Sequence, residues 1–174
     1  MIPVYLLTRR QLIPKPLPEL FAFFERPENL AHLTPEELGF QVLTPTPLLM
    51  RDGAIIDYVI KVGGMHLHWR TMITEYVRGQ KFIDEQLVGP YLFWHHTHQF
   101  METDEGTIMV DHIRYAMRFG ILGRLAHALF VRVKLRSIFD FRADQIAKVF
   151  PSGGEGLKLW NDQEGKRGQR KVTE

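Results

Sequence analysis

Residues 91–117 read YLFWHHTHQFMETDEGTIMVDHIRYAM, and this stretch is the strongest indication of the fold. Its two halves are rich in aromatic and β-branched residues, and the polar segment ETDEG between them is typical of a turn. The stretch therefore predicts a β-hairpin. Successive side chains of a strand point to opposite faces, so Trp94, His96, His98 and Phe100 share one face of the first strand. The two large aromatic residues assign that face to the interior.

The register of this hairpin decides which side chains meet. Pairing Met101 with Ile108 places His98 opposite Asp111. A carboxylate beside an imidazole can fix the tautomer of the ring or raise its pKa, so this pair is a candidate functional feature. The same register pairs Phe100 with Met109 and Trp94 with Tyr115.

The strand before the hairpin, KFIDEQLV, adds further polar groups to the same face. Across the Gly89-Pro90 turn it pairs Trp94 with Gln86 and His96 with Asp84. The interior face is then expected to carry a polar cluster within an aromatic surround. The polar members are Asp84, Gln86, His96, His98 and Asp111, and the aromatic ones are Trp69, Trp94, Phe100 and Tyr115.

A buried polar cluster of this size admits three interpretations. Each unpaired group would cost about 1–3 kcal/mol, so the groups either satisfy one another around a water-lined interior or face a ligand. Catalytic acid–base residues are the third interpretation. A register error of one residue would instead turn the whole set toward solvent. By the same alternation His66, His68 and Arg70 are expected to point outward, opposite Leu67, Trp69 and Ile73.

The segments before the hairpin predict further strands and short helices. Residues 2–13 are rich in β-forming residues, and residues 14–39 contain prolines that suit two or three short helices. Thr34-Pro35-Glu36-Glu37 has the form of a capping box, and Gly39 fits a helix end. Residues 40–117 predict six strands joined by tight turns, which makes an antiparallel meander.

The segments after the hairpin predict one long helix and a tail. Apolar residues recur at three- and four-residue steps through residues 120–149, and Pro151 follows. A curved sheet of seven strands can be filled by one amphipathic helix lying across it, and a cavity between the two would suit a small molecule. We therefore expect one domain over residues 1–150 and a polar, flexible tail over residues 151–174.

Composition excludes several classes of protein. The chain has 174 residues, is 45% hydrophobic and carries a net charge of +2, which does not indicate a nucleic-acid-binding protein. It has no cysteine, so disulfides and thiolate metal sites are ruled out. The N-terminal segment lacks the pattern of a signal peptide, and there is no apolar run of about 18 residues. These features predict a cytoplasmic protein.

Three strings, FFERPENLAHLTPEELGF, DEQLVGPYLFWHHTHQF and IFDFR, together with the order of the elements, resemble the START-like (SRPBCC) superfamily in its polyketide cyclase/dehydrase-like branch. The resemblance covers roughly residues 3–149. It implies an α+β helix-grip fold, in which a curved antiparallel sheet wraps a long C-terminal helix and leaves a hydrophobic cavity. Members of the superfamily bind lipids, quinones, hormones or polyketides, and only some are enzymes. The branch supplies no catalytic residues that transfer to this chain.

A cupin-like metal enzyme is the main alternative. Gly89, His96, His98 and Glu102 approximate the first cupin motif, and a His-x-His pair with a nearby carboxylate is a plausible zinc or iron site. The glycine-to-histidine spacing is one residue too long, however, and the second motif is missing. The serine-hydrolase pattern and phosphate-binding glycine loops are absent as well.

The long helix is strongly basic. Residues 114–148 contain eight basic residues against Asp140 and Asp144. The simplest interpretation is a solvated helix face, and the alternative is transient contact with an anionic membrane.

Taken together, these patterns favour a non-catalytic protein that binds a hydrophobic small molecule bearing a polar group. No metal or cofactor is expected. The state could be a monomer, or a homodimer paired through an exposed edge strand. For an enzyme, the chemistry would be a cyclisation or dehydration with His98 as the base and Asp111 as its orienting partner.

Overall fold

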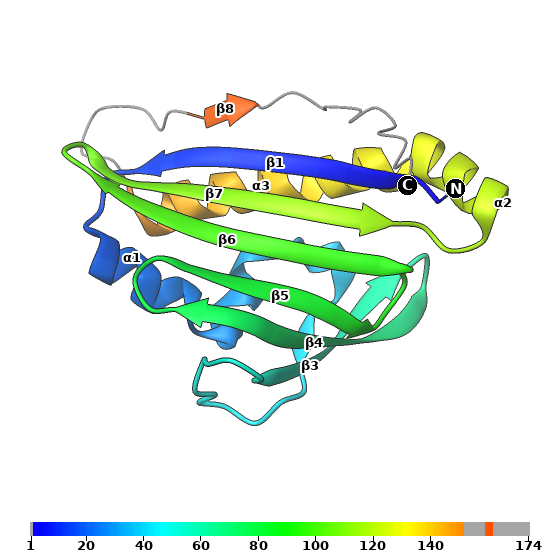
Figure 1. Ribbon diagram of the computed structural model, residues 1–174, viewed down its shortest axis with the longest axis horizontal. Helices are drawn as coiled ribbons and strands as arrows, with labels where there is room; N and C mark the ends of the chain where they lie inside the picture. The colour runs from blue at the N-terminus through cyan, green and yellow to red at the C-terminus, as the bar shows by residue number, and fades with distance from the viewer. Residues whose placement is uncertain (1, 152–158, 162–174) are drawn as a thin grey trace, which may run out of the picture.

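The computed structural model describes residues 2–151 and 159–161. A single curved antiparallel sheet forms one layer, and helices cover one of its faces (Figure 1). The strand order across the sheet is β2-β3-β4-β5-β6-β7-β1-β8. The strands are β1 (Val4–Ile13), β2 (Gln41–Val42), β3 (Ile55–Val62), β4 (Met65–Val77), β5 (Lys81–Val88), β6 (Phe93–Thr103), β7 (Gly106–Ala116) and β8 (Leu159–Asn161).

The seven strands β1–β7 and the long C-terminal helix confirm the predicted helix-grip fold. The eighth strand, β8, lies in the region predicted to be a flexible tail, and it pairs antiparallel with Arg9–Gln11 of β1. The other residues to which that prediction applies, 152–158 and 162–174, lie outside the described part of the chain.

Glycines make the two sharpest turns of the meander possible. Gly63 and Gly64 form the two-residue loop between β3 and β4, with φ of 58° and 86°, which is the backbone that a tight hairpin turn requires. Gly106 opens β7 at φ 130°, and a Cβ at this position would collide with the carbonyl oxygen of Ile13. The β6–β7 hairpin therefore packs directly against the end of β1.

Three short helices connect β1 to β2, as the prolines predicted. They are α1 (Leu17–Phe24) and the 3-10 helices η1 (Pro27–Leu33) and η2 (Glu36–Leu38). Gly39 ends η2 at φ 48°, as expected of a helix terminus. The predicted capping box does not form, because the Thr34 hydroxyl donates backward to the Leu30 carbonyl at 2.7 Å and so stabilises the end of η1.

The C-terminal helical segment runs from Gly120 to Val149, as predicted, but it is not uniform. It begins as α2 (Gly120–Ala126), widens into a π-helical turn, η3 (His127–Val131), and continues as α3 (Arg132–Val149). Helix α3 lies across the concave face of the sheet (Figure 1). Gln11 of β1 donates to the Ala143 carbonyl at 3.2 Å, which fixes the position of α3 against β1. Within the described residues, none of the helices has both the length and the apolar character needed to cross a membrane.

The core consists of two apolar clusters on the concave face. One is formed under α1 and the end of α3, and the other is an aromatic cluster nearer the start of α3. The first contains Ile13, Leu20, Phe21, Leu33, Met50, Ala54, Ile56, Ile73, Phe82, Phe100, Met109, Ile146 and Phe150, and the second contains Leu7, Trp69, Tyr91, Trp94, Ile113, Tyr115, Leu135 and Phe139.

Candidate functional site

The predicted register of the β6–β7 hairpin is confirmed. His98 lies opposite Asp111, Phe100 opposite Met109 and Trp94 opposite Tyr115. On the other side of β6, His96 pairs with Asp84 as expected. The predicted pair of Trp94 with Gln86 does not form. Gln86 instead closes the β5–β6 turn, since its amide nitrogen donates to the Tyr91 carbonyl at 2.9 Å and its amide oxygen accepts from the Tyr91 N–H at 3.3 Å.

Four side chains from three adjacent strands form a buried His–Asp quartet: Asp84 on β5, His96 and His98 on β6, and Asp111 on β7. One oxygen of each carboxylate lies between the two imidazoles. Asp111 Oδ1 lies 3.0 Å from His96 Nε2 and 2.8 Å from His98 Nδ1. Asp84 Oδ2 lies 3.3 Å from His96 Nδ1 and 3.2 Å from His98 Nε2. Each of the four ring nitrogens therefore lies within 3.3 Å of a carboxylate oxygen, and two of these contacts, His96 Nε2 to Asp111 and His98 Nε2 to Asp84, have hydrogen-bond geometry.

The quartet sits between the two apolar clusters. His98 stacks on Phe82 with ring centroids 4.3 Å apart, and His96 meets the edge of Phe139 at 5.7 Å. His96, His98 and Asp111 are 4%, 7% and 5% exposed. Charges removed from water to this degree are stable only when they are paired, so the four groups depend on one another.

The surroundings separate the pKa values of the two histidines. Burial lowers the pKa of His96, and the neighbouring His98 lowers it further. Burial also acts to lower the pKa of His98, but its hydrogen bonds to Asp111 and Asp84 outweigh that effect and raise it. Burial alone would raise the pKa of Asp111, yet the bonds to His96 and His98 hold it well below its usual range. These opposite shifts favour the protonated form of His98 and the neutral form of His96, beside two ionised aspartates.

Arg142 of α3 supplies the second positive charge. It is 9% exposed, and its guanidinium lies 4.7 Å from the centroid of the Phe139 ring. Burial acts to raise the pKa of Asp84, but His96 and His98 lower it, and the charge of Arg142 adds a smaller lowering effect. Arg142 and His98 together balance the two carboxylates. This role was not predicted, because in the sequence Arg142 is one of many basic residues on the long helix.

A cavity of about 90 Å³ opens beside the quartet. Its walls are mostly apolar and come from the short helices, the β2–β3 connection, strands β2–β6 and α3. Asp84, His98 and Arg142 supply charged groups to it, and Tyr58 and Thr71 supply hydroxyls that hydrogen bond each other at 3.2 Å. The apolar lining is made by Phe23, Phe24, Pro27, Leu30, Leu33, Phe40, Val42, Met50, Ile56, Ile73 and Phe82.

The predicted site residues are divided between this cavity and the core. Asp84 and His98 line the cavity, and His96 and Asp111 complete the quartet that these two belong to. The predicted aromatic lining is elsewhere, because Trp69, Trp94 and Tyr115 belong to the aromatic cluster and Phe100 packs on Phe21 at 5.2 Å. Phe82, Tyr58 and Thr71 are lining residues that the sequence did not single out, since each requires knowing how β3, β4 and β5 lie relative to the short helices.

Comparison with known proteins identifies the family. Residues 13–142 match the family described as polyketide cyclase / dehydrase and lipid transport. The chain belongs to this family. A comparison with curated protein sequences gives no match.

Solved structures of similar fold agree with this assignment. TTHA0849 from Thermus thermophilus is 18% identical with a TM-score of 0.62, covering 83% of this chain and 98% of that one. CV1439 from Chromobacterium violaceum is 14% identical with a TM-score of 0.64, covering 85% and 99%. The di-domain ARO/CYC StfQ from the steffimycin biosynthetic pathway is 15% identical with a TM-score of 0.62, covering 84% of this chain and 50% of that one. At these identities the likeness shows the fold.

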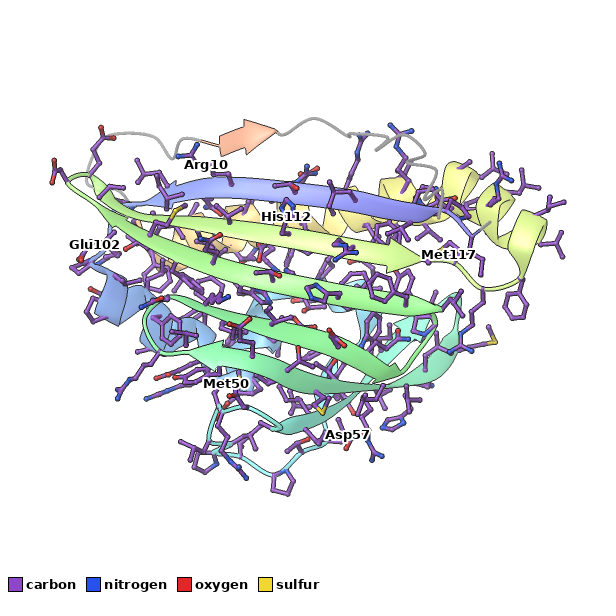
Figure 2. The ribbon with its side chains drawn as sticks, in the orientation of Figure 1. Arg10, Met50, Asp57, Glu102, His112 and Met117 are labelled. Atoms are coloured by element: carbon purple, nitrogen blue, oxygen red, sulfur yellow. The ribbon has the colours of Figure 1, made fainter. Side chains whose placement is uncertain are left out.

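Membership of this family excludes the cupin interpretation, and the proposed cupin ligand set is not assembled. Glu102 is exposed at the end of β6, next to the turn into β7 (Figure 2). Asp84, from the neighbouring strand, lies beside the histidine pair instead. Asp84, His96 and His98 each offer one ligand-type atom, and these atoms lie within 4.8 Å of one another. The same atoms take part in the ion pairs of the quartet, so the quartet accounts for them without a metal ion.

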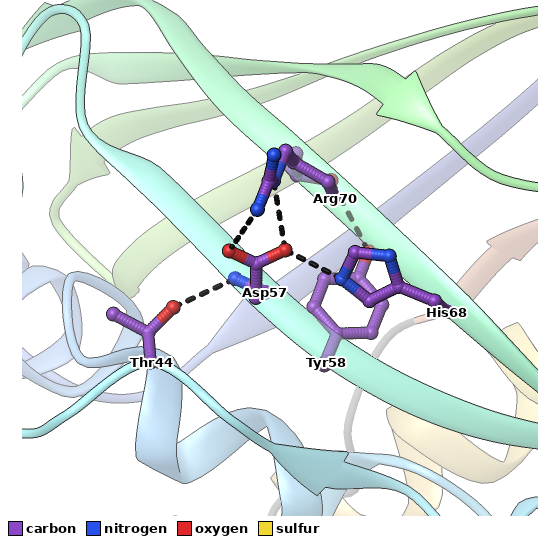
Figure 3. Close-up of polar contacts among 6 residues, drawn as sticks. Thr44, Asp57, Tyr58, His68 and Arg70 are labelled. Carbon is purple, nitrogen blue, oxygen red and sulfur yellow. Dashed lines mark hydrogen bonds and ion pairs between the residues drawn. The ribbon is translucent and has the colours of Figure 1, made fainter.

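A second cluster of similar composition lies on the outer face of the sheet. His66, His68 and Arg70 point outward as predicted, and His68 and Arg70 both contact Asp57 of β3 (Figure 3). Asp57 Oδ1 lies 2.6 Å from His68 Nε2 and 2.9 Å from Arg70 Nε. The hydrogen bond from Arg70 is the main reason that the pKa of Asp57 is lowered. This outer cluster borders solvent rather than a cavity.

Proposed function

We propose that the protein binds a hydrophobic small molecule bearing an oxygen-containing polar group in the cavity beside the quartet. The observation that carries the proposal is a mostly apolar cavity with charged groups in its wall. Asp84, His98 and Arg142 lie on the side of the quartet, and Arg26 comes from the connection between α1 and η1. This combination is typical of ligand sites, in which apolar walls give affinity and a few polar groups fix orientation. The description of the family as cyclases, dehydrases and lipid-transport proteins supports the same class of ligand.

Arg142 suggests the chemistry of the polar group. Its Nε is buried, and among the described residues it has no hydrogen-bond partner. A buried donor without a partner costs about 1–3 kcal/mol, so an incoming acceptor at this position is favoured. A carbonyl, phenol or carboxylate oxygen would accept from Arg142, and a hydroxyl could also donate to the carboxylate of Asp84. Lipids, quinones and polyketide-like molecules all carry such groups.

The size of the cavity limits how such a ligand enters. Its volume of about 90 Å³ is below the roughly 300–1,000 Å³ of sites for drug-sized ligands. A larger ligand therefore requires the walls to move apart. The short helices are the part most able to move, because they contribute Phe24, Leu30 and Leu33 to the wall but do not belong to the hydrogen-bonded sheet.

The geometry favours binding over acid–base catalysis. Both nitrogens of His98 lie within 3.2 Å of carboxylate oxygens, which compete with a ligand for contact with the ring. The raised pKa of His98 also favours its protonated form, which suits a proton donor better than the base that the sequence suggested. A cyclase or dehydratase that uses the His98–Asp111 pair remains the second candidate, with His98 acting as the acid.

Native mass spectrometry of the protein purified from its own host tests the proposal. The matched variants are Leu30→Trp, which fills the cavity from η1, and Leu49→Trp, which adds the same side chain at an exposed position. We expect an organic mass on the wild type and on Leu49→Trp that is absent from Leu30→Trp. An equal mass on all three would place the ligand elsewhere, and one stoichiometric metal ion would replace the proposal with a metal site at Asp84, His96 and His98.

If the purified protein carries no ligand, binding in the cavity is tested with an added probe. The dye 1-anilinonaphthalene-8-sulfonate has an apolar ring system and an anionic oxygen group that matches Arg142. We expect saturable binding by the wild type and by Leu49→Trp, and a loss of about tenfold or more in affinity for Leu30→Trp. Equal affinity for the two variants contradicts the cavity as the site.

A further inference from the structure

The start of the C-terminal helical segment exposes large apolar side chains to solvent. Phe119 is 82% exposed, Ile121 80% and Leu122 73%. Four more follow within α2, η3 and the first turn of α3. The apolar patch, as we define it, consists of Phe119, Ile121, Leu122, Leu125, Leu129, Phe130 and Val133. Scattered apolar residues on a surface are ordinary, but seven within fifteen residues mark an interaction surface.

The opposite side of this segment is fixed to the sheet, which keeps the apolar patch turned outward. His127 of η3 stacks on Tyr5 with ring centroids 3.4 Å apart, and its Nε2 shares a hydrogen bond of 2.9 Å with the Tyr115 hydroxyl. A Cβ at Gly123 would collide with the Arg118 carbonyl oxygen, so only glycine permits this close approach of α2 to the chain that follows β7. The patch is therefore not a surface that α2 could bury by a small rotation.

Further exposed apolar residues lie at the same end of the molecule. Val4 at the start of β1 pairs with Ala116 at the end of β7, and it is 57% exposed, as is Ile2. Leu92, which precedes β6, is 46% exposed, and its N–H donates to the Ala116 carbonyl. Figure 1 shows the N-terminus and α2 together at this end, and Figure 2 places Met117 at the junction. Exposed apolar side chains are thus present on the strand ends at this end of the molecule as well as on the helix.

The charged residues of the segment that carries the apolar patch are all basic. Residues 118–136 contain no Asp or Glu, and their basic residues are Arg118, Arg124, Arg132, Lys134 and Arg136. The charge of Lys134 is balanced by an ion pair with Glu37 at 2.9 Å. The other basic residues of the segment are arginines. An exposed apolar helix bordered by arginines matches the interface of a bilayer with anionic lipids. A second copy of the chain fits less well, because a symmetric contact would bring like charges together.

We propose that this end of the molecule docks on an anionic lipid bilayer. The apolar patch enters the boundary between head groups and acyl chains, and the arginines contact lipid phosphates. This inference does not depend on the cavity or its ligand.

Co-sedimentation with vesicles tests the proposal directly. The vesicles contain phosphatidylcholine with 30% phosphatidylglycerol, roughly the charge density of an anionic leaflet, and pure phosphatidylcholine serves as the reference. We expect the wild type to bind the anionic vesicles at low salt and to be released as salt increases, because exposed charges are screened. No retention on anionic vesicles at low salt overturns the proposal.

Paired variants separate the apolar from the electrostatic contribution. Leu122→Ser/Phe130→Ser should lower the partition coefficient by about tenfold or more, since two large apolar groups are removed. The control Leu43→Ser/Leu49→Ser removes exposed apolar groups from the β2–β3 connection and should bind like the wild type. Equal binding by the two double variants overturns the proposal. All four positions are at least half exposed, so thermal unfolding should change little.

The arginines are tested in the same way. Arg124→Gln/Arg132→Gln should weaken binding to anionic vesicles by about fivefold for each arginine, whereas Arg51→Gln/Arg78→Gln should leave it unchanged. Sedimentation equilibrium tests the alternative that a second copy of the chain covers the apolar patch. A dimer that Leu122→Ser/Phe130→Ser converts to a monomer, without vesicle binding by the wild type, would assign the patch to a second copy of the chain and overturn the proposal.

Discussion

The same residue types form two clusters on opposite faces of the sheet, and the two differ in their surroundings. On the outer face, Asp57 is held by His68 and Arg70, and both of these basic side chains are exposed. On the inner face, the His–Asp quartet and Arg142 combine aspartate, histidine and arginine in the same way, but water is largely excluded. The outer pairs interact in a high dielectric, and the inner ones in a low one.

This difference determines what each cluster can do. Exposed ion pairs add little to stability, and they change little when a partner is lost. Buried charges are expensive unless paired, and an apolar replacement of similar volume is often as stable. The inner cluster is therefore poorly explained by stability alone, whereas its position beside an apolar cavity gives it a use in binding. The outer cluster has no such neighbour among the described residues.

The largest expected effect is the loss of stability when one carboxylate is removed from each cluster in turn. Asp111→Ala should lower the free energy of unfolding by about 3–5 kcal/mol, because it leaves the His98 imidazolium buried without its closest partner. Asp57→Ala is the matched control and should lower it by about 1 kcal/mol or less. Urea unfolding at pH 7 measures both. Similar losses for the two variants would mean that the quartet is better solvated than its burial implies.

The β6–β7 hairpin shows how far the sequence alone leads. Its register was predictable because two aromatic residues fix the inward face and a short turn fixes the pairing, so the contact of His98 with Asp111 followed. The alternation rule failed at Gln86, where the side chain closes a turn by bonding the Tyr91 backbone. Such a bond depends on local loop geometry that strand periodicity does not describe.

The rest of the site depends on packing between distant segments. Arg142 is one basic residue among eight in its region, and only the placement of α3 across the sheet brings it to Asp84. The cavity wall likewise required knowing that Leu30 and Phe24 line the same cavity as residues of β3 and β4. The apolar periodicity of residues 120–149 predicted the helix but not which of its apolar side chains would be covered. Of the described residues, none covers Ile121 or Leu122, which are 80% and 73% exposed.

The second expected effect is a pH dependence that belongs to the inner cluster. The folded pKa of His98 is raised, so its contribution to stability is fully present below its unfolded pKa of about 6.5 and is lost as pH rises through the folded value. The pKa values of Asp84, Asp111 and His96 are lower in the folded protein than in the unfolded chain. As pH falls, the unfolded chain therefore takes up protons first and becomes more stable relative to the folded protein, so these three groups act in the opposite direction. Stability should therefore decline on both sides of about pH 6.5.

Urea unfolding across the range of roughly pH 5 to 9 tests this profile. Above about pH 6.5 the free energy of unfolding should fall with a limiting slope of about 1.4 kcal/mol per pH unit, the value for one proton. The variant His98→Gln should not show this fall in stability at alkaline pH. The variant His112→Gln, on the exposed side of β7, should still show it. A flat or rising wild-type profile from about pH 6.5 to 8 would show that His98 is not held as a cation, and NMR titration of its ring protons would confirm that result.

The smallest expected effect distinguishes the clusters by salt. Exposed charges are screened within about 8 Å at physiological ionic strength, whereas buried pairs are screened much less. The loss caused by Asp57→Ala, about 0.2–1 kcal/mol at low salt, should approach zero in roughly 0.5 M sodium chloride, where the Debye length falls to the ion-pair spacing of the side chains. The loss caused by Asp111→Ala should remain. Urea is the suitable denaturant because it is uncharged. A salt-sensitive loss for Asp111→Ala would indicate that water reaches the quartet, and the cavity beside it would then be a solvent-filled entrance, so that a ligand would first have to displace that water.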